Sequence, residues 1–152
     1  MATIVNLDMV AAKKGDVVTV KNGSDVLENG AFIALGALEN TGLGRSTRMV
    51  EKLSEGCQLA FLADVALQYD ENKDERDYQL LAGKVGRAYR AISGESVTIA
   101  ESHVADTVAV GDKLEVKADS YQLQAVTTGK AVAVVLEKYN FEGQDSLYIE
   151  FI

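Results

Sequence analysis

The sequence of 152 residues contains no proline and no tryptophan, and it has a single cysteine and a single histidine. Cys57 alone cannot form an intrachain disulfide, so the chain is not a disulfide-stapled scaffold. Cys57 and His103 together are too few soft ligands for a closed zinc site within one chain. No serine lies in a G-x-S-x-G turn, which carries the nucleophile of many hydrolases. We therefore expect no metal, no cofactor and no catalytic residues.

A Cys–His pair is the remaining route to a nucleophile with a nearby base. Cys57 lies in a polar turn before an apolar run, whereas His103 lies in the polar segment 101–106. Because the two contexts are unrelated, we interpret Cys57 as packed or half-exposed and His103 as a surface residue. An enzyme that uses Cys57 as its nucleophile is therefore a disfavoured hypothesis.

Basic residues are outnumbered, with 15 Lys and Arg against 23 Asp and Glu and a net charge of -8. A chain of this charge repels phosphate backbones, so we expect no nucleic-acid partner. The candidate basic patches are two arginine pairs, Arg45 with Arg48 and Arg87 with Arg90.

Long hydrophobic runs are also missing. The longest clean apolar run, 131–136, predicts a buried strand and is far too short for a membrane helix. The N-terminus lacks the basic and apolar regions of a signal peptide. We expect a protein made in the cytoplasm, with no membrane partner.

Two further segments suggest ligand binding and lack the pattern that it requires. The acidic run 70–77 does not have the residue order or the bend glycine of a calcium-binding loop. The glycine-rich segment 41–45 matches neither the dinucleotide-binding fingerprint nor the P-loop. We interpret both segments as solvated or flexible loops.

Alternating apolar and polar residues predict β-strands along much of the chain. Several of these runs follow a Gly-Asp or Gly-Glu turn, and one continues to the last residue. The predicted strands are 16–21, 96–100, 112–117, 131–136 and 146–152. A terminal strand rich in β-branched and aromatic residues is usually tied into a sheet, so we expect an ordered C-terminus.

The middle of the chain is less regular. The apolar segment 59–67 fits a helix by propensity or a buried strand by its length and continuity. Glycines 83 and 86 weaken a helix and favour a turn into a strand at 87–92. We expect a mainly β fold, a small barrel or sandwich, with at most one or two short helices, and 74–81 is the segment where one would lie.

Two segments of the chain resemble each other. Gly15–Lys21 and Gly111–Lys117 share Gly, Asp, two apolar positions and Lys, and an apolar strand follows each of them. We interpret the repeat as one hairpin used twice, over 15–36 and 111–135, within a single domain of residues 11–152. Duplicated hairpins commonly build small barrels and sandwiches, so the repeat predicts architecture rather than activity.

Tyrosine is the most frequent aromatic residue. Its six copies fall mostly on predicted strands, and the acidic charge argues against a base-stacking role. We interpret the tyrosines as packing residues at the edge of the core and at interfaces.

A particular order of motifs runs through the second half of the chain. Gln68–Glu71 places a tyrosine before acids, Ala82-Gly-Lys-Val-Gly-Arg-Ala-Tyr-Arg90 follows, and a strand begins at Gly94. Farther on, the Gly-Asp strand at 110–116 is followed by the glycine-led apolar strand 128–136. This order is similar to that of the capsid decoration proteins, also called cement proteins, of tailed bacteriophages.

The resemblance implies a β-rich structural protein without enzyme activity that sits on the outer surface of the virion. Such a protein binds the major capsid protein, bridges neighbouring subunits and stabilises the shell. It also implies a homo-oligomer, with a trimer favoured. A second hypothesis is a small β-barrel module that binds carbohydrate or peptide on a phage fibre or another assembly, through the loops 40–48 or 70–77.

The residues that would contact a capsid fall into two groups. Residues 1–10 are apolar enough to dock as an extended arm that adds a strand to a partner sheet, and they equally fit the first strand of the protein's own sheet. The arginine pairs form the second group. The candidate interface residues are Ile4, Val5, Leu7, Met9, Arg45, Arg48, Arg87 and Arg90.

Overall fold

The computed structural model describes residues 3–10, 16–39, 47–64 and 78–152. Within these ranges the chain forms eleven β-strands and a single turn of 3-10 helix, η2 (Glu101–His103). The prediction of a mainly β fold is confirmed.

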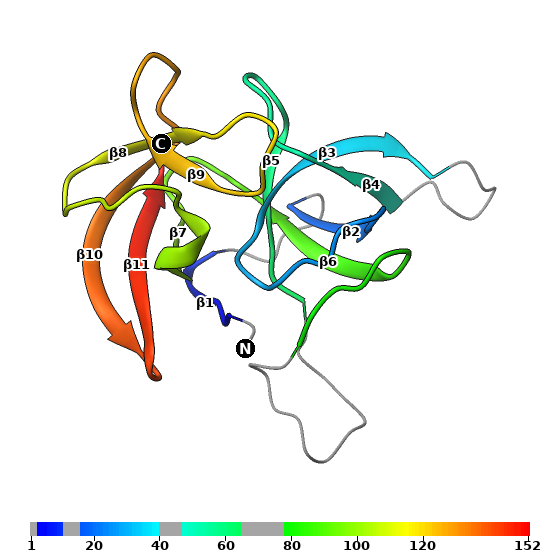
Figure 1. The fold of residues 1–152 in the computed structure, drawn as a ribbon, viewed down its shortest axis with the longest axis horizontal. Helices are drawn as coiled ribbons and strands as arrows, with labels where there is room; N and C mark the ends of the chain where they lie inside the picture. The colour runs from blue at the N-terminus through cyan, green and yellow to red at the C-terminus, as the bar shows by residue number, and fades with distance from the viewer. Residues whose placement is uncertain (1–2, 11–15, 40–46, 65–77) are drawn as a thin grey trace.

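Five consecutive strands close into a barrel in the order β2-β4-β3-β5-β6 (Figure 1). Their bounds are β2 Val17–Lys21, β3 Phe32–Leu38, β4 Thr47–Glu51, β5 Leu59–Leu62 and β6 Val85–Arg90. β2 and β4 run parallel, whereas every other neighbouring pair is antiparallel. A parallel pair needs a crossover connection, which β3 provides on the far side of β4.

The other six strands form a sheet in the order β1-β7-β11-β10-β8-β9. Their bounds are β1 Asn6–Met9, β7 Ser96–Ala100, β8 Lys113–Val116, β9 Leu123–Ala125, β10 Ala133–Phe141 and β11 Gln144–Phe151. The neighbouring strands are antiparallel. β11, the last strand of the chain, lies between β7 and β10, so the C-terminal strand is tied into the sheet on both sides, as predicted.

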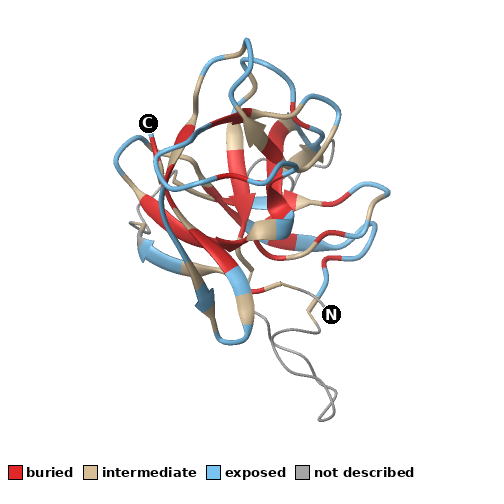
Figure 2. Cartoon of the chain, turned by 60° about the vertical axis from the view of Figure 1, so that its left-hand side comes forward, coloured by how far each residue is buried: buried red, intermediate tan, exposed pale blue. Residues whose placement is uncertain are grey.

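The barrel and the sheet share one hydrophobic core. The ring of Phe61, on β5, stacks on Tyr89 of β6 with 5.8 Å between centroids, and on Phe151 of β11 with 5.6 Å. Buried aliphatic side chains from the sheet surround these rings, among them Val97, Ile99, Leu114, Leu147 and Ile149. One face of the sheet therefore packs against the outside of the barrel wall, and buried segments gather in the middle of the molecule (Figure 2).

β5 is buried on both of its faces. Ala60 and Leu62 belong to the core inside the barrel, whereas Phe61 between them belongs to the core shared with the sheet. Successive strand residues point to opposite faces, so a strand covered on both sides needs apolar residues throughout. The apolar run at 59–67 is therefore a strand over Leu59–Leu62, and residues 65–67 lie outside the described ranges.

Small residues on β6 make room inside the barrel. A Cβ atom at Gly86 would lie 3.2 Å from the side chain of Leu80 and 3.2 Å from the carboxylate of Asp64. Ala88, two residues farther along the same face, is fully buried. The Gly-Arg-Ala-Tyr stretch thus alternates between filling the barrel and facing outward, which makes it a strand that begins at Val85, two residues earlier than predicted.

The prediction that the first copy of the repeat forms a hairpin is wrong. β2 pairs with β4 and β6, while β3 pairs with β4 and β5, so residues 15–36 form no hairpin. The reason is barrel closure, because β4 inserts between the two strands. In the second copy β8 does pair with β10, although β9 lies between them in the sequence.

Residues 78–81, the described part of the segment 74–81 for which we expect at most one short helix, contain no helix. Leu80 there forms an antiparallel bridge with Leu27, with N–H to carbonyl distances of 3.0 and 2.7 Å. The backbone groups that a helix would pair internally are used to join two loops of the barrel. Residues 74–77 lie outside the described ranges.

Phe61→Ala tests the shared core. Removing a fully buried ring that stacks on two others should lower the free energy of unfolding by about 3–5 kcal/mol, because a cavity remains. Val26→Ala is the control, since Val26 is 53% exposed and should change stability by less than about 0.5 kcal/mol. Urea unfolding followed by circular dichroism measures both, and equal midpoints for the two variants would contradict the assignment.

Candidate interaction surface

The N-terminal residues form an edge strand of the protein's own sheet. β1 (Asn6–Met9) pairs antiparallel with β7. Ile4 is buried, Val5 packs against the shared core, and Leu7 is 37% exposed. Gln144 holds Ile4 on both sides, accepting from its N–H at 3.0 Å and donating to its carbonyl at 3.1 Å. Of the two alternatives for residues 1–10, the described part is the first strand, and Leu7 remains available for contact.

Arg48 and Arg90 converge on the exposed side chain of Gln58, which directly precedes β5. The Oε1 atom of Gln58 accepts from Arg48 Nη2 at 3.4 Å and from Arg90 Nη1 at 3.2 Å. Arg48 also donates to the carbonyls of Gly36, at 2.6 Å, and Leu35, at 3.2 Å. The β3–β4 register shifts at this point, and a bulge leaves carbonyls without partners in the strand ladder. Arg48 therefore completes the hydrogen bonding of the barrel.

The arginine pairs do not form one basic patch. Arg87 is exposed on β6 and lies opposite Thr19 of β2. Arg90 follows three residues later and so points to the other face of the strand. Arg45 lies outside the described residues, as do the loops assigned to a carbohydrate- or peptide-binding module, 40–48 and 70–77, apart from Thr47 and Arg48 in β4.

The sheet presents a distinctive set of side chains on the face turned away from the core. Directly paired residues of antiparallel strands point to the same side, so the strand register defines this set. Three rows cross the sheet there: Glu137–Tyr148–Thr98–Asn6, Tyr139–Ser146–Ala100 and Val134–Glu150–Ser96. We call these residues, with Asp8 and Phe141, the outer face. Figure 1 shows β10 and β11, which carry most of it, on the side of the molecule away from the barrel.

Two tyrosine rings of the outer face are fixed by their own hydroxyl groups. Tyr148 Oη lies 2.9 Å from Ser96 Oγ, and Tyr139 Oη lies 2.7 Å from Thr98 Oγ1. The Thr98 hydroxyl donates its single proton to Asp8 Oδ2 at 2.8 Å, so Tyr139 is the donor to Thr98. Ser96 and Thr98 point away from the core and are nevertheless buried, and each is hydrogen-bonded to a tyrosine of the outer face.

The outer face is also aromatic and acidic. Tyr139 and Phe141 meet edge to face, with 6.3 Å between centroids and 72° between the ring planes. The acidic side chains are Asp8 and Glu137, which are exposed, and Glu150, which is half-buried. The nearest cation in the strand register is Lys113, which pairs with Val134 at the margin.

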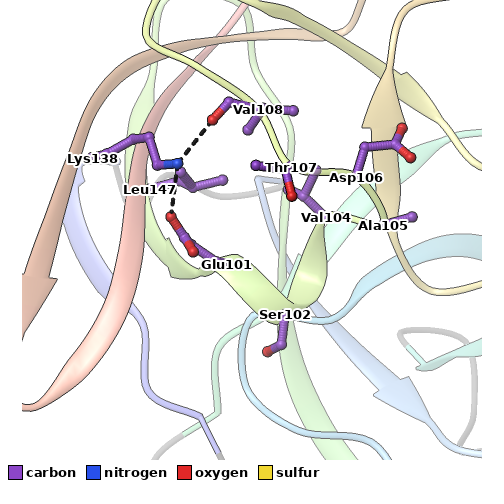
Figure 3. Close-up of a pocket in the computed structure, with 9 residues that line it drawn as sticks. All are labelled: Glu101, Ser102, Val104, Ala105, Asp106, Thr107, Val108, Lys138 and Leu147. Carbon is purple, nitrogen blue, oxygen red and sulfur yellow. Dashed lines mark hydrogen bonds and ion pairs between the residues drawn. The ribbon is translucent and has the colours of Figure 1, made fainter.

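A cavity of about 290 Å³ lies between the segment 101–108 and strands β10 and β11 (Figure 3). Lys138 reaches into it, donates to the carbonyl of Val108 at 2.9 Å and lies 3.3 Å from Glu101 Oε1. Figure 3 shows Asp106 turned away from this ammonium group. Lys138 is thus engaged by its own chain and fastens the segment to the sheet.

Cys57 and His103 lie in separate surroundings. Cys57 is half-buried and lines a cavity of about 440 Å³ between the turn 54–57 and the segment 128–132. His103 is buried, which corrects the prediction of a surface residue. Its Nε2 lies 2.7 Å from Thr3 Oγ1 and 3.1 Å from the carbonyl of Asn29. Since each has its own neighbours, the structure does not assemble a Cys–His dyad.

Burial sets the protonation of His103. It lowers the pKa of the imidazole from 6.5 to about 4, against a smaller opposing effect of the hydrogen bond to Asn29. Between these two values the unfolded chain binds a proton that the folded chain does not. The contribution of His103 to the free energy of unfolding is therefore fully present above pH 6.5, and it is lost as the pH falls toward 4.

The interface residues predicted from the sequence do not include the acids of the outer face. Asp8, Glu137 and Glu150 come from three different strands, and only the pairing register brings them onto one surface. The interpretation of the tyrosines as packing residues agrees with the places of Tyr89, in the shared core, and Tyr139 and Tyr148, above Thr98 and Ser96.

Comparison of the chain with protein-family models, with curated protein sequences and with solved structures returns no significant match. In the described ranges no helix has the length and hydropathy needed to cross a membrane. The same residues contain no cluster of three or more His, Cys, Asp or Glu side chains arranged to hold a metal ion.

His103→Gln tests the histidine. The wild-type free energy of unfolding should fall by about 3 kcal/mol between pH 7 and pH 4 because of this residue, over and above the contribution of carboxylates. The variant keeps a side-chain donor but has no group that titrates in this range, so its decline should be smaller by that amount. Urea unfolding at several pH values measures the difference, and parallel pH profiles would contradict the shift.

Proposed function

We propose that this chain is a non-enzymatic structural protein that binds the outside of a tailed-bacteriophage capsid. In this role it bridges neighbouring subunits of the major capsid protein and stabilises the shell as a homo-oligomer, with a trimer favoured. The observation that carries the proposal is the outer face, a sheet surface on which exposed acids lie beside partly exposed aromatic rings.

The outer face has the character of a protein-binding surface. Tyrosine and phenylalanine are enriched at interfaces, because they present a large contact area with few rotatable bonds. Tyr139 and Tyr148 are already held by Thr98 and Ser96, so binding a partner would restrict them little further. A surface that is rigid before binding favours repeated attachment to a regular lattice.

The fold suits a protein that has to resist mechanical force. The barrel closes on itself and so has no free edge of its own. The stacked rings of Phe61, Tyr89 and Phe151 join it to the sheet through one continuous core. Force applied to either part would be opposed by the packing of both.

The resemblance to decoration proteins supports the same proposal through the motif at 82–90. Gly86 and Ala88 fill the barrel, and Tyr89 enters the shared core. The motif is therefore evidence about the fold more than about residues that bind a partner. Within it, Arg87 is the exposed cationic side chain on a strand.

Co-sedimentation with expanded capsid shells of the cognate phage tests this function. We expect saturable binding in a fixed ratio to the major capsid protein, and shells that disassemble at a higher temperature once decorated. Bovine serum albumin at the same concentration is the control for trapped protein. Sedimentation of the shells without the chain, at low and at physiological ionic strength, would overturn the proposal.

A further inference from the structure

We propose that the outer face binds a basic segment of its protein partner, whose arginine or lysine side chains lie over the rings of Tyr139 and Tyr148 and pair with the neighbouring carboxylates. This inference rests on the proposed function, because it takes the partner to be a protein surface, and it adds the chemistry that recognises that partner.

The hydroxyl groups of both tyrosines are already used within the chain. Tyr139 donates to Thr98, and Tyr148 shares a hydrogen bond with Ser96. What remains for a partner is the exposed part of each ring. A ring face carries negative electrostatic potential and attracts ammonium or guanidinium groups, and guanidinium also stacks on the ring plane.

Carboxylates lie next to both rings. Glu137 pairs directly with Tyr148 across β10 and β11, a relation that places Cβ atoms roughly 5 Å apart. Glu137 also lies two residues from Tyr139 on the same face of β10, and Glu150 lies two residues from Tyr148 on β11. A cation above either ring would therefore be within reach of a carboxylate, and the two attractions would act together.

The carboxylates of the outer face form no ion pair with a cation of the described residues. The ion pairs found there join Lys21 to Glu39, Lys52 to Asp119 and Lys138 to Glu101, all away from this face. The whole chain carries a net charge of -8, so its field also attracts a basic surface. A neutral carbohydrate would gain nothing from this charge, which favours the cationic segment as the occupant.

Matched variants separate this chemistry from general effects of charge and folding. Glu137→Lys reverses a charge on the outer face, and Glu55→Lys makes the same change at an exposed position in the turn 54–57. We expect Glu137→Lys to weaken shell binding at least tenfold and Glu55→Lys to change it less than twofold. Thermal unfolding of each variant checks that the fold is kept.

The rings are tested in the same way. Tyr148→Phe keeps the ring and loses the hydrogen bond to Ser96, whereas Tyr148→Leu loses the ring. Binding should weaken less than threefold in the first and about tenfold in the second. If Tyr148→Leu does not fold, the exposed charge pair Glu137→Lys and Glu55→Lys still decides the question.

A probe that needs no capsid distinguishes failure of this inference from failure of the proposed function. The peptide acetyl-Arg-Ser-Arg-Ser-Arg-amide is titrated into isotope-labelled protein, and maltohexaose is the neutral comparison. Salt-sensitive amide shifts in β7, β10 and β11 caused by the peptide alone support the inference, even if shells are not bound. Equal shell binding by wild type and Glu137→Lys, or shifts caused by the sugar and not by the peptide, would overturn it.

Discussion

The stacking of Phe61 between Tyr89 and Phe151 is the contact on which the rest of the structure depends. It joins β5 and β6 of the barrel to β11 of the sheet, so that a single core stabilises both parts. The same contact fixes which face of the sheet turns inward. With Leu147 and Ile149 committed to that core, alternation along β11 turns Ser146, Tyr148 and Glu150 outward. The candidate interaction surface is thus a consequence of how the core is packed.

The sequence predicts those features of the fold that are encoded locally. The runs 16–21, 96–100 and 112–117 alternate after turn signals, and they form β2, β7 and β8 to within one residue. Pairing between strands is different, because it depends on segments far apart in the chain. β2 accepts β4 as a parallel neighbour because barrel closure demands it, and no local signal in residues 15–36 distinguishes that arrangement from a hairpin.

The candidate site is less predictable than the fold for the same reason. His103 has polar neighbours in sequence and reads as a surface residue, yet Thr3 and Asn29 bury it from segments 100 and 74 residues away. The outer face needs the register of several strands before its acids and rings come together. The arginines singled out from sequence have diverse roles, with Arg48 bonded to barrel carbonyls and Arg87 exposed on β6.

We propose that the acidic, aromatic face of the sheet attaches this protein to a capsid. A cryo-electron microscopy reconstruction of expanded shells decorated with the purified chain tests it most directly. We expect density in which β7, β10 and β11 face the shell, with basic side chains of the capsid protein over Tyr139 and Tyr148. Density that places the barrel against the shell and leaves the outer face in solvent would contradict it.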